Sequence, residues 1–160
     1  MDRVYHEIEP VYDHSSKILI LGSFPSVKSR ENHFYYGHPQ NRFWKVLEKL
    51  YDIHFTDIES KKQFLHKNHI ALWDVIESCE IEGSSDASIR NIKLNDIKKI
   101  IDESAIEKIY VNGKKAQEYY NKYVLDKTKI SCIPLPSTSP ANAAYSLDKL
   151  IEKWKIIKKV

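Results

Sequence analysis

The hydrophobic pattern of this chain alternates between short apolar runs and longer segments in which apolar residues recur at helical spacing. Four runs are short, mainly apolar and closed by polar, glycine or proline residues, as is typical of buried strands. We expect strands at residues 17–21, 70–75, 108–111 and 130–135. Helical spacing predicts helices at residues 41–51, 60–67, 94–101, 116–123 and 147–157.

This alternation predicts an α/β fold: a three-layer α/β/α arrangement around a central, mainly parallel four-stranded sheet. The loops that follow parallel strands leave the sheet at one edge, so four segments should meet in a crevice there. These segments are residues 22–25, Asp74, residues 112–113 and residues 136–142. Residues 1–16 are expected to form an irregular lead that packs Val11 and Tyr12 onto the domain, and residues 77–91 to form a loop.

Length and composition favour one globular unit. With 160 residues, 42% of them hydrophobic, the chain can bury one sizeable core, so we expect a single domain over residues 1–160. No signal-peptide pattern opens the sequence, and no apolar run approaches the roughly 20 residues that span a bilayer. We therefore expect a cytoplasmic monomer without a membrane partner. Lys and Arg outnumber Asp and Glu by 25 to 22, which permits an anionic partner without requiring one.

Several classes of chemistry are disfavoured by the motifs. Two cysteines, Cys79 and Cys132, cannot form a disulfide framework or a four-cysteine iron-sulfur cluster. His66 and His69 lack further zinc ligands at suitable spacing, so we expect solvated histidines at a helix end and no metal site. The phosphate-binding loop, the dinucleotide fingerprint and the serine nucleophile elbow do not occur in the sequence.

The segment between the first strand and the first helix carries polar and aromatic side chains that a core would rarely use. Amides and flat rings together suit a planar polar ligand. The residues concerned are Asn32, His33, Phe34, Tyr35, Tyr36, His38, Gln40 and Asn41.

Four separated blocks carry a resemblance to a known family. They are the turn at residues 22–26 (GSFPS), residues 36–44 (YGHPQNRFW), residues 72–75 (LWDV) and residues 135–142 (LPSTSPAN). Together and in this order they resemble the uracil-DNA glycosylase superfamily, and most of all its hypoxanthine (deoxyinosine) DNA glycosylase branch. The likeness runs from about Val11 to the end of the chain.

The resemblance implies an enzyme of base excision repair. It would flip a deaminated base out of duplex DNA, most readily hypoxanthine, and hydrolyse the N-glycosidic bond without a cofactor. Its product would pass to enzymes that process abasic sites. Two alternatives remain: a glycosylase specific for uracil or mismatches, and a catalytically weak module that binds DNA or nucleotides in the same cleft.

The resemblance also implies the catalytic residues. In related branches a carboxylate or amide binds water at the position of Phe24, which cannot do so and is assigned to base binding. Asn41 is implied instead, with its side-chain carbonyl accepting a hydrogen bond from water; the alternative is that Asn41 only caps the following helix. Ser137 stands where other branches have a catalytic histidine and should be a weaker electrostatic catalyst.

Two further residues match base-binding positions. The ring of Tyr36 would stack on the extruded base, although a loop tyrosine packed on a neighbour is an equally simple interpretation. Asp74, at the end of the second strand, would accept an N–H group of the base, although aspartates in such places are often helix caps or ion-pair partners.

The remaining implied contacts are with DNA. The loop at residues 137–142 matches one that enters the minor groove, but its sequence also suits a rigid turn. Lys115, Lys149 and Lys153 are further basic candidates, which otherwise simply solvate helices. The DNA-binding candidates are Ser23, Ser26, His38, Lys114, Ser139, Ala141 and Asn142.

Overall fold

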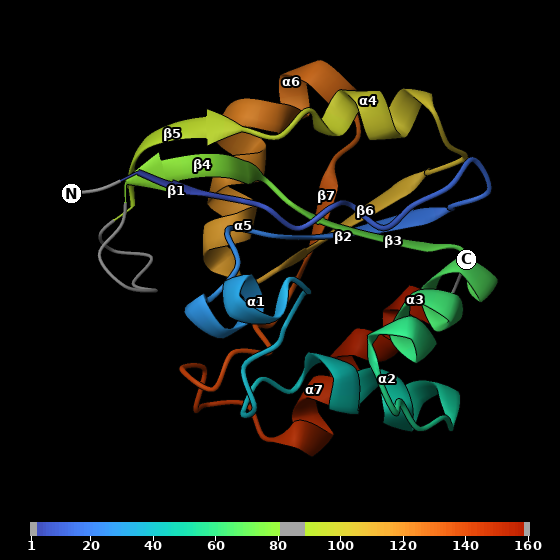
Figure 1. Cartoon of the computed structure of the whole chain (residues 1–160). Coiled ribbons are helices and arrows are strands. Elements are labelled where there is room, and N and C mark those ends of the chain that lie inside the picture. The colour runs from blue at the N-terminus through green and yellow to red at the C-terminus, as the bar shows by residue number, and fades with distance from the viewer. Residues whose placement is uncertain (1–2, 81–88, 159–160) are drawn as a thin grey trace.

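The computed structural model describes residues 3–80 and 89–158, with a four-stranded parallel sheet at its centre (Figure 1). All five residues of its strand β2 are buried, as expected for a sheet covered on both faces. The strands run in the order β3-β2-β6-β7, which confirms the predicted parallel sheet. Their bounds are β2 (Ile18–Gly22), β3 (Ile70–Asp74), β6 (Lys108–Asn112) and β7 (Cys132–Leu135).

Helices cover both faces of this sheet and complete the three predicted layers (Figure 1). One face packs against α2 (Phe43–Tyr51), α3 (Ile58–Lys67) and α7 (Leu147–Trp154), which continues into the 3-10 helix η3 (Lys155–Lys158). The other face packs against α4 (Ile97–Asp102) and a continuous helical segment made of α5 (Lys114–Tyr119), η2 (Tyr120–Val124) and α6 (Leu125–Thr128). Each face buries its own apolar cluster.

The carboxyl ends of the parallel strands lie at one edge of the sheet, as predicted. The register of β2 and β3 pairs Gly22 with Asp74, and that of β6 and β7 pairs Asn112 with Leu135. The backbone N–H of Gly113 donates to the carbonyl of Leu135 over 3.0 Å. The polar residues that follow these strands are therefore brought to a common edge.

A second sheet was not predicted. It is antiparallel, in the order β1-β4-β5, and consists of β1 (Arg3–Tyr5), β4 (Ile76–Glu80) and β5 (Arg90–Leu94). Residues 3–5 were expected to belong to an irregular lead, and residues 77–80 and 90–91 to a loop. All of them form strands, so both expectations are wrong for these residues. The strand β1 is too short to show a period, and β5 is mostly exposed, so neither has a clear apolar pattern. The polar part of that expected loop, residues 83–88, lies outside the described residues.

Three smaller expectations need comment. A six-residue helix, α1 (Val27–Asn32), occupies part of the expected loop, because Ser26 caps it by accepting from the N–H of Ser29. His66 is exposed at the end of α3, as expected, but His69 is half-buried at a φ of 60° and its Nδ1 is sealed from solvent. Val11 forms an isolated bridge with Leu72, which confirms its packing.

In residues 3–80 and 89–158, no helix is long and apolar enough to cross a membrane. The same residues contain no cluster of three His, Cys, Asp or Glu side chains placed to hold a metal ion.

Candidate active site

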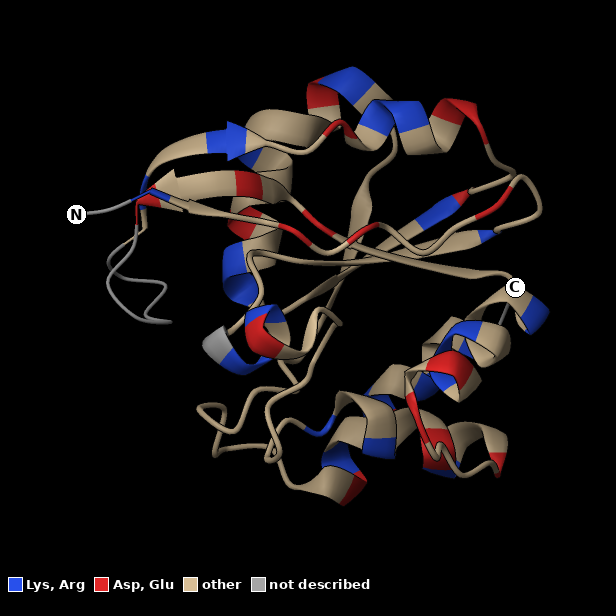
Figure 2. Ribbon diagram, viewed as in Figure 1, with Lys and Arg blue, Asp and Glu red and all other residues tan. Residues whose placement is uncertain are grey.

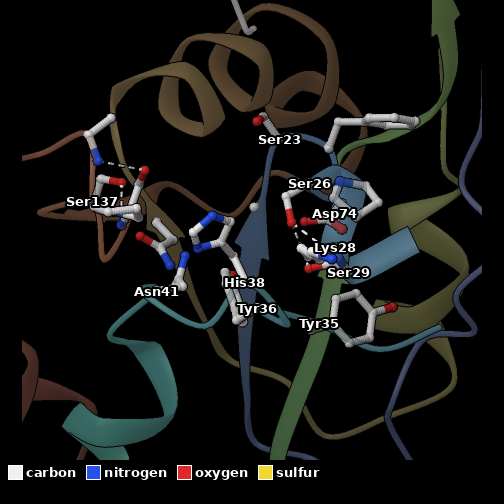
Figure 3. A pocket seen from close by; sticks show the side chains of 17 residues that line it. Ser23, Ser26, Lys28, Ser29, Tyr35, Tyr36, His38, Asn41, Asp74 and Ser137 are labelled. Carbon is white, nitrogen blue, oxygen red and sulfur yellow. Dashed lines mark hydrogen bonds between the residues drawn. The ribbon is translucent and has the colours of Figure 1, made fainter. Parts of the chain in front are cut away.

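A cleft of about 470 Å³ opens at the carboxyl edge of the parallel sheet (Figure 3). Sequence reasoning missed Lys28 and Ser29 as lining residues, whereas Tyr35 and Asn112 lie in segments that were expected to form the crevice or its ligand-binding loop. Lys114 and Asn142 lie outside the cleft and instead line an adjacent depression of about 850 Å³. Ten of the predicted site residues line the cleft itself: Ser23, Phe24, Ser26, Tyr36, His38, Asn41, Asp74, Ser137, Ser139 and Ala141.

One end of the cleft, here called the Asp74 end, is built around a buried carboxylate. Asp74 is only 3% exposed, and its Oδ2 atom lies 2.8 Å from Nε2 of His6. The His6 side chain is itself 1% exposed and packs against the rings of Phe24 and Tyr35. The other oxygen, Oδ1, has no hydrogen-bond partner among residues 3–80 and 89–158, so it remains available as an acceptor.

The lack of a side chain at Gly22 leaves space for the Asp74 carboxylate. A Cβ atom at position 22 would lie 2.3 Å from Oδ1 of Asp74, closer than atoms can approach, and 3.4 Å from the hydroxyl of Tyr36. Glycine is therefore required where β2 and β3 end side by side. His6 was missed because the contact spans 68 residues and depends on the unpredicted pairing of β1 with β4.

Tyr36 lies between the two ends of the cleft (Figure 3). Its backbone adopts a left-handed conformation, φ 55°, and its ring stacks on Phe43 with centroids 4.0 Å apart. One ring face is therefore used by the protein core. Burial, together with the charge of Asp74, raises the pKa of the Tyr36 hydroxyl, while the nearby amide of Asn112 partly offsets this. The hydroxyl stays protonated, yet it makes no hydrogen bond of good geometry.

Two other aromatic residues support the Asp74 end. Tyr35 is 2% exposed and donates its hydroxyl to the carbonyl of Glu9 over 2.8 Å; burial first, and Asp74 second, raise its pKa. Phe24 is half-buried, with the guanidinium of Arg30 5.6 Å from its ring centroid. Both side chains help to surround the His6 imidazole with apolar surface.

The opposite end, here called the Asn41 end, is a chain of polar side chains. Oδ1 of Asn41 accepts two hydrogen bonds of 2.9 Å, from the backbone N–H of Phe43 and from the hydroxyl of Thr138. Thr138 is fully buried, and its hydroxyl accepts from Nδ2 of Asn112 over 3.0 Å. Asn41 thus contacts the first N–H group of α2, but the N-cap position itself is occupied by Arg42, which makes no side-chain capping bond, so the alternative of Asn41 as the helix cap holds only in this looser form. Sequence reasoning gave no role to Thr138 or Asn112.

The loop at residues 136–145 forms the rim beside the Asn41 end. Arg42 donates to the carbonyls of Ser139 and Asn142 over 2.9 and 3.1 Å, and also to that of Tyr145. Asn142 donates its amide to the Ser137 carbonyl over 3.0 Å, so this side chain faces its own loop. These bonds give the loop the rigid-turn character that the sequence allows, and they hold it against the N-terminus of α2.

Basic residues are available around the site (Figure 2). Lys28 lies on α1 and lines the cleft, although it also pairs with Glu31 at 3.2 Å. Lys114, Lys115 and Lys153 line the adjacent depression, which shares Ser137, Ser139 and Ala141 with the rim. Lys149 is exposed on α7 and lines neither hollow. Positive charge thus borders the cleft on the side of the rim loop.

The chain is similar to several known proteins. Two curated relatives named hypoxanthine DNA glycosylase are each 36% identical to the chain. The one from Methanosarcina acetivorans aligns over 155 residues, 92% of this chain and 93% of the relative. The one from Methanosarcina barkeri aligns over 113 residues, 69% of this chain and 72% of the relative.

A solved structure is also similar. It is a solution NMR structure of a protein from Methanosarcina acetivorans, provisionally named a uracil DNA glycosylase. It superposes with a TM-score of 0.81 at 32% identity and covers 95% of this chain and 94% of that one. The family model described as the uracil DNA glycosylase superfamily matches residues 9–160. The chain therefore belongs to the uracil-DNA glycosylase superfamily.

Proposed function

We propose that this protein is a DNA glycosylase of base excision repair that excises hypoxanthine from deoxyinosine in duplex DNA. Its relatives of similar length carry the name of that activity. The observation that carries the assignment is the Asp74 end, where a buried carboxylate keeps one oxygen free beside the ring of Tyr36.

That oxygen distinguishes a deaminated base from its parent. Hypoxanthine carries a hydrogen on N1, which donates to a carboxylate, whereas adenine presents a bare ring nitrogen that a carboxylate repels. The imino N–H of uracil offers the same donor, which keeps uracil as the nearest alternative substrate. Stacking of the base on the free face of Tyr36 contributes ~1 to 3 kcal/mol.

Excision then needs no cofactor. The bond between C1′ and N9 breaks, its electron pair goes to the purine, and a water oxygen bonds to C1′. The water loses one proton to solvent and the departing purine gains one, so the sum is a hydrolysis that leaves an abasic site. The site residues proposed to act directly on the reacting groups are Asn41 and Ser137.

DNA is held at the rim in this proposal. Ser139, Ala141 and Asn142 of the rim loop would approach the minor groove, and Ser23, Ser26, His38 and Lys114 would approach phosphates. Apart from Lys114 and Asn142 these residues line the cleft. The rim loop is preformed by its bonds to Arg42, so its docking on DNA costs little ordering entropy.

The proposal is tested with a duplex that contains one deoxyinosine, incubated with excess protein and treated with alkali. Strand cleavage at that nucleotide is the expected result. Matched duplexes containing deoxyuridine, deoxyxanthosine or no lesion rank the substrates. Tight binding to these duplexes without any abasic site would contradict the proposal and favour the weak DNA-binding module.

A further inference from the structure

The orientation of the Asn41 amide follows from two backbone N–H groups, which can only donate. The N–H of Phe43 points at one atom of the Asn41 amide, so that atom is the oxygen, Oδ1. The N–H of Thr138 points at Oδ1 of Asn112 over 3.0 Å, so the other atom of that amide is the NH₂ group. Neither amide is free to be assigned the other way round.

The hydroxyl proton of Thr138 is fixed by the same logic. Its oxygen accepts from Nδ2 of Asn112, so its proton points onward to Oδ1 of Asn41. Oδ1 therefore accepts from Phe43 and Thr138 together, and a carbonyl oxygen has two lone pairs. The oxygen that was expected to receive a water molecule is already occupied.

What Asn41 offers to the cleft is its NH₂ group. Among residues 3–80 and 89–158, Nδ2 of Asn41 makes no hydrogen bond, and Asn41 lines the cleft. Nδ2 is also absent from the buried polar atoms left without a partner in that part of the chain, so it is open to the cleft. A donor with no protein partner is left facing the space where the base would lie.

We propose that Asn41 donates a hydrogen bond to the departing base, with Thr138 and Asn112 as the positioning residues that turn its amide. This inference rests on the proposed glycosylase function. Asp74 and Asn41 lie on opposite sides of Tyr36 in the cleft (Figure 3). A purine whose N1–H meets Asp74 therefore directs its other side, with the acceptors N3 and N7 and the bond to the sugar, toward Asn41.

The chemistry favours the base over the water as the partner of this donor. As the C1′–N9 bond breaks, negative charge spreads from N9 to N3 and N7, and an N–H aimed at either atom becomes stronger in the transition state. An N–H bonded to water would instead engage the lone pair that must attack C1′. The hydrogen bond from Asn41 thus lowers the activation barrier by stabilising the departing base.

The Asn41→Asp variant separates the two roles. It keeps an oxygen to accept from Phe43 and Thr138 but replaces the NH₂ group by a second acceptor. If Asn41 donates, Asn41→Asp should lose at least as much single-turnover rate on a deoxyinosine duplex as Asn41→Ala, about 10²- to 10³-fold. A carboxylate that retains more than a tenth of the wild-type rate would overturn the proposal, because an acceptor would then suffice.

Thr138→Val tests the positioning with the amide itself intact. The loss of one hydrogen bond should lower the rate about 3- to 10-fold, and it should cause no further loss in an Asn41→Ala background. A rate equal to or above wild type would contradict the proposal, since freeing the carbonyl would then help. Thr128→Val, which removes a hydroxyl that is bonded to Tyr120 and to the backbone N–H of Ile130 and lines neither hollow, is the matched control and should leave the rate unchanged.

Failure of the inference differs from failure of the proposed function. A wild-type protein that releases no hypoxanthine removes the function itself. A wild-type protein that releases hypoxanthine, with Asn41→Asp equally active, overturns only the donor role. Thermal unfolding of each variant confirms that the compared proteins are folded, which matters most for Asn41→Ala because it also removes the acceptor for Phe43.

Discussion

The two ends of the cleft expose hydrogen-bonding groups of opposite kind. At each end a polar side chain is held by a residue distant in the chain: His6 holds Asp74 across 68 positions, and Thr138 holds Asn41 across 97. At the Asp74 end the holding bond leaves a free acceptor. At the Asn41 end two holding bonds consume the acceptor and leave a free donor.

The difference would match the two sides of a purine bound as proposed. The side with N1–H needs an acceptor, and the side next to the breaking bond needs donors while negative charge grows there. The Asp74 end is also deeper: Asp74 is 3% exposed, whereas Asn41 is half-buried beside the rim loop. In the proposed function, recognition would therefore lie at the bottom of the cleft and bond cleavage nearer to the DNA.

After the Asn41 variants, the largest effect is expected from a side chain that fills the Asp74 end. Gly22→Ala would place a Cβ atom 2.3 Å from Oδ1 of Asp74, and the carboxylate cannot yield easily because it is bonded to His6. Displacement of a reading group by about 1 Å costs about 100-fold in rate. Single-turnover excision from a deoxyinosine duplex measures the loss.

Gly37→Ala is the matched control for that substitution. Its new contacts would be 3.2 Å to the end of the Asn32 side chain, which can move, and 3.3 and 3.4 Å to backbone atoms of Ser29 and Lys28, all much longer than the 2.3 Å at position 22. We expect a much smaller loss than for Gly22→Ala. Comparable rates for the two variants would show that the space beside Asp74 is not part of the binding site.

The next largest effect is expected when the acceptor at the Asp74 end is replaced by a donor. Asp74→Asn removes the charge that receives N1–H and adds an amide donor at the same place. Loss of a charge-assisted hydrogen bond, ~1.5 to 3 kcal/mol, corresponds to a decrease of about 10- to 150-fold on hypoxanthine. Rates on a panel of hypoxanthine, uracil and xanthine duplexes should change their ranking. An unchanged ranking would indicate a purely structural aspartate.

Sequence reasoning succeeded for the parallel sheet and for the position of Asp74 at its edge. The parallel sheet and the convergence of its loops follow from apolar runs such as residues 18–21, which are local signals. The antiparallel sheet was missed because β1 and β5 are short or exposed and are defined by long-range pairing. Asp74 was placed correctly at the edge because its strand ended there.

No local sequence pattern identified the residues that hold Asp74 and Asn41 in place. His6 precedes any periodic element, and only the folded chain brings it to Asp74. Thr138 belonged to a motif, but its buried hydroxyl and its bond to Asn41 depend on α2 packing against the rim loop. Residue types were therefore predictable, whereas the direction in which each amide points required the hydrogen-bond network.

Tyr36 lies between the two ends, and its role should depend on the ring alone. Tyr36→Ala should lose about 5- to 150-fold in single-turnover efficiency, corresponding to ~1 to 3 kcal/mol of stacking. Tyr36→Phe should be mild, because the hydroxyl makes no good hydrogen bond and remains protonated. Equal, small losses for both variants would place the ring outside the base site and leave Phe24 or Tyr35 as the stacking residue.

The smallest effect is expected from the partner of Asp74. His6→Phe keeps an aromatic ring between Phe24 and Tyr35 but removes the hydrogen bond to Oδ2. We expect a loss of about 3- to 10-fold on hypoxanthine, and no additional loss in the Asp74→Asn background. Additive losses in that double variant would show that His6 acts independently of the carboxylate.

The most direct test of the account is a crystal structure with a duplex containing a deoxyinosine analogue that resists hydrolysis. The account predicts an extruded base stacked on Tyr36, with N1 at about 2.7 to 3.2 Å from Oδ1 of Asp74. The NH₂ group of Asn41 should contact N3 or N7 on the opposite side of the base. A base that lies elsewhere, or one whose N1 edge faces Asn41, would contradict the account.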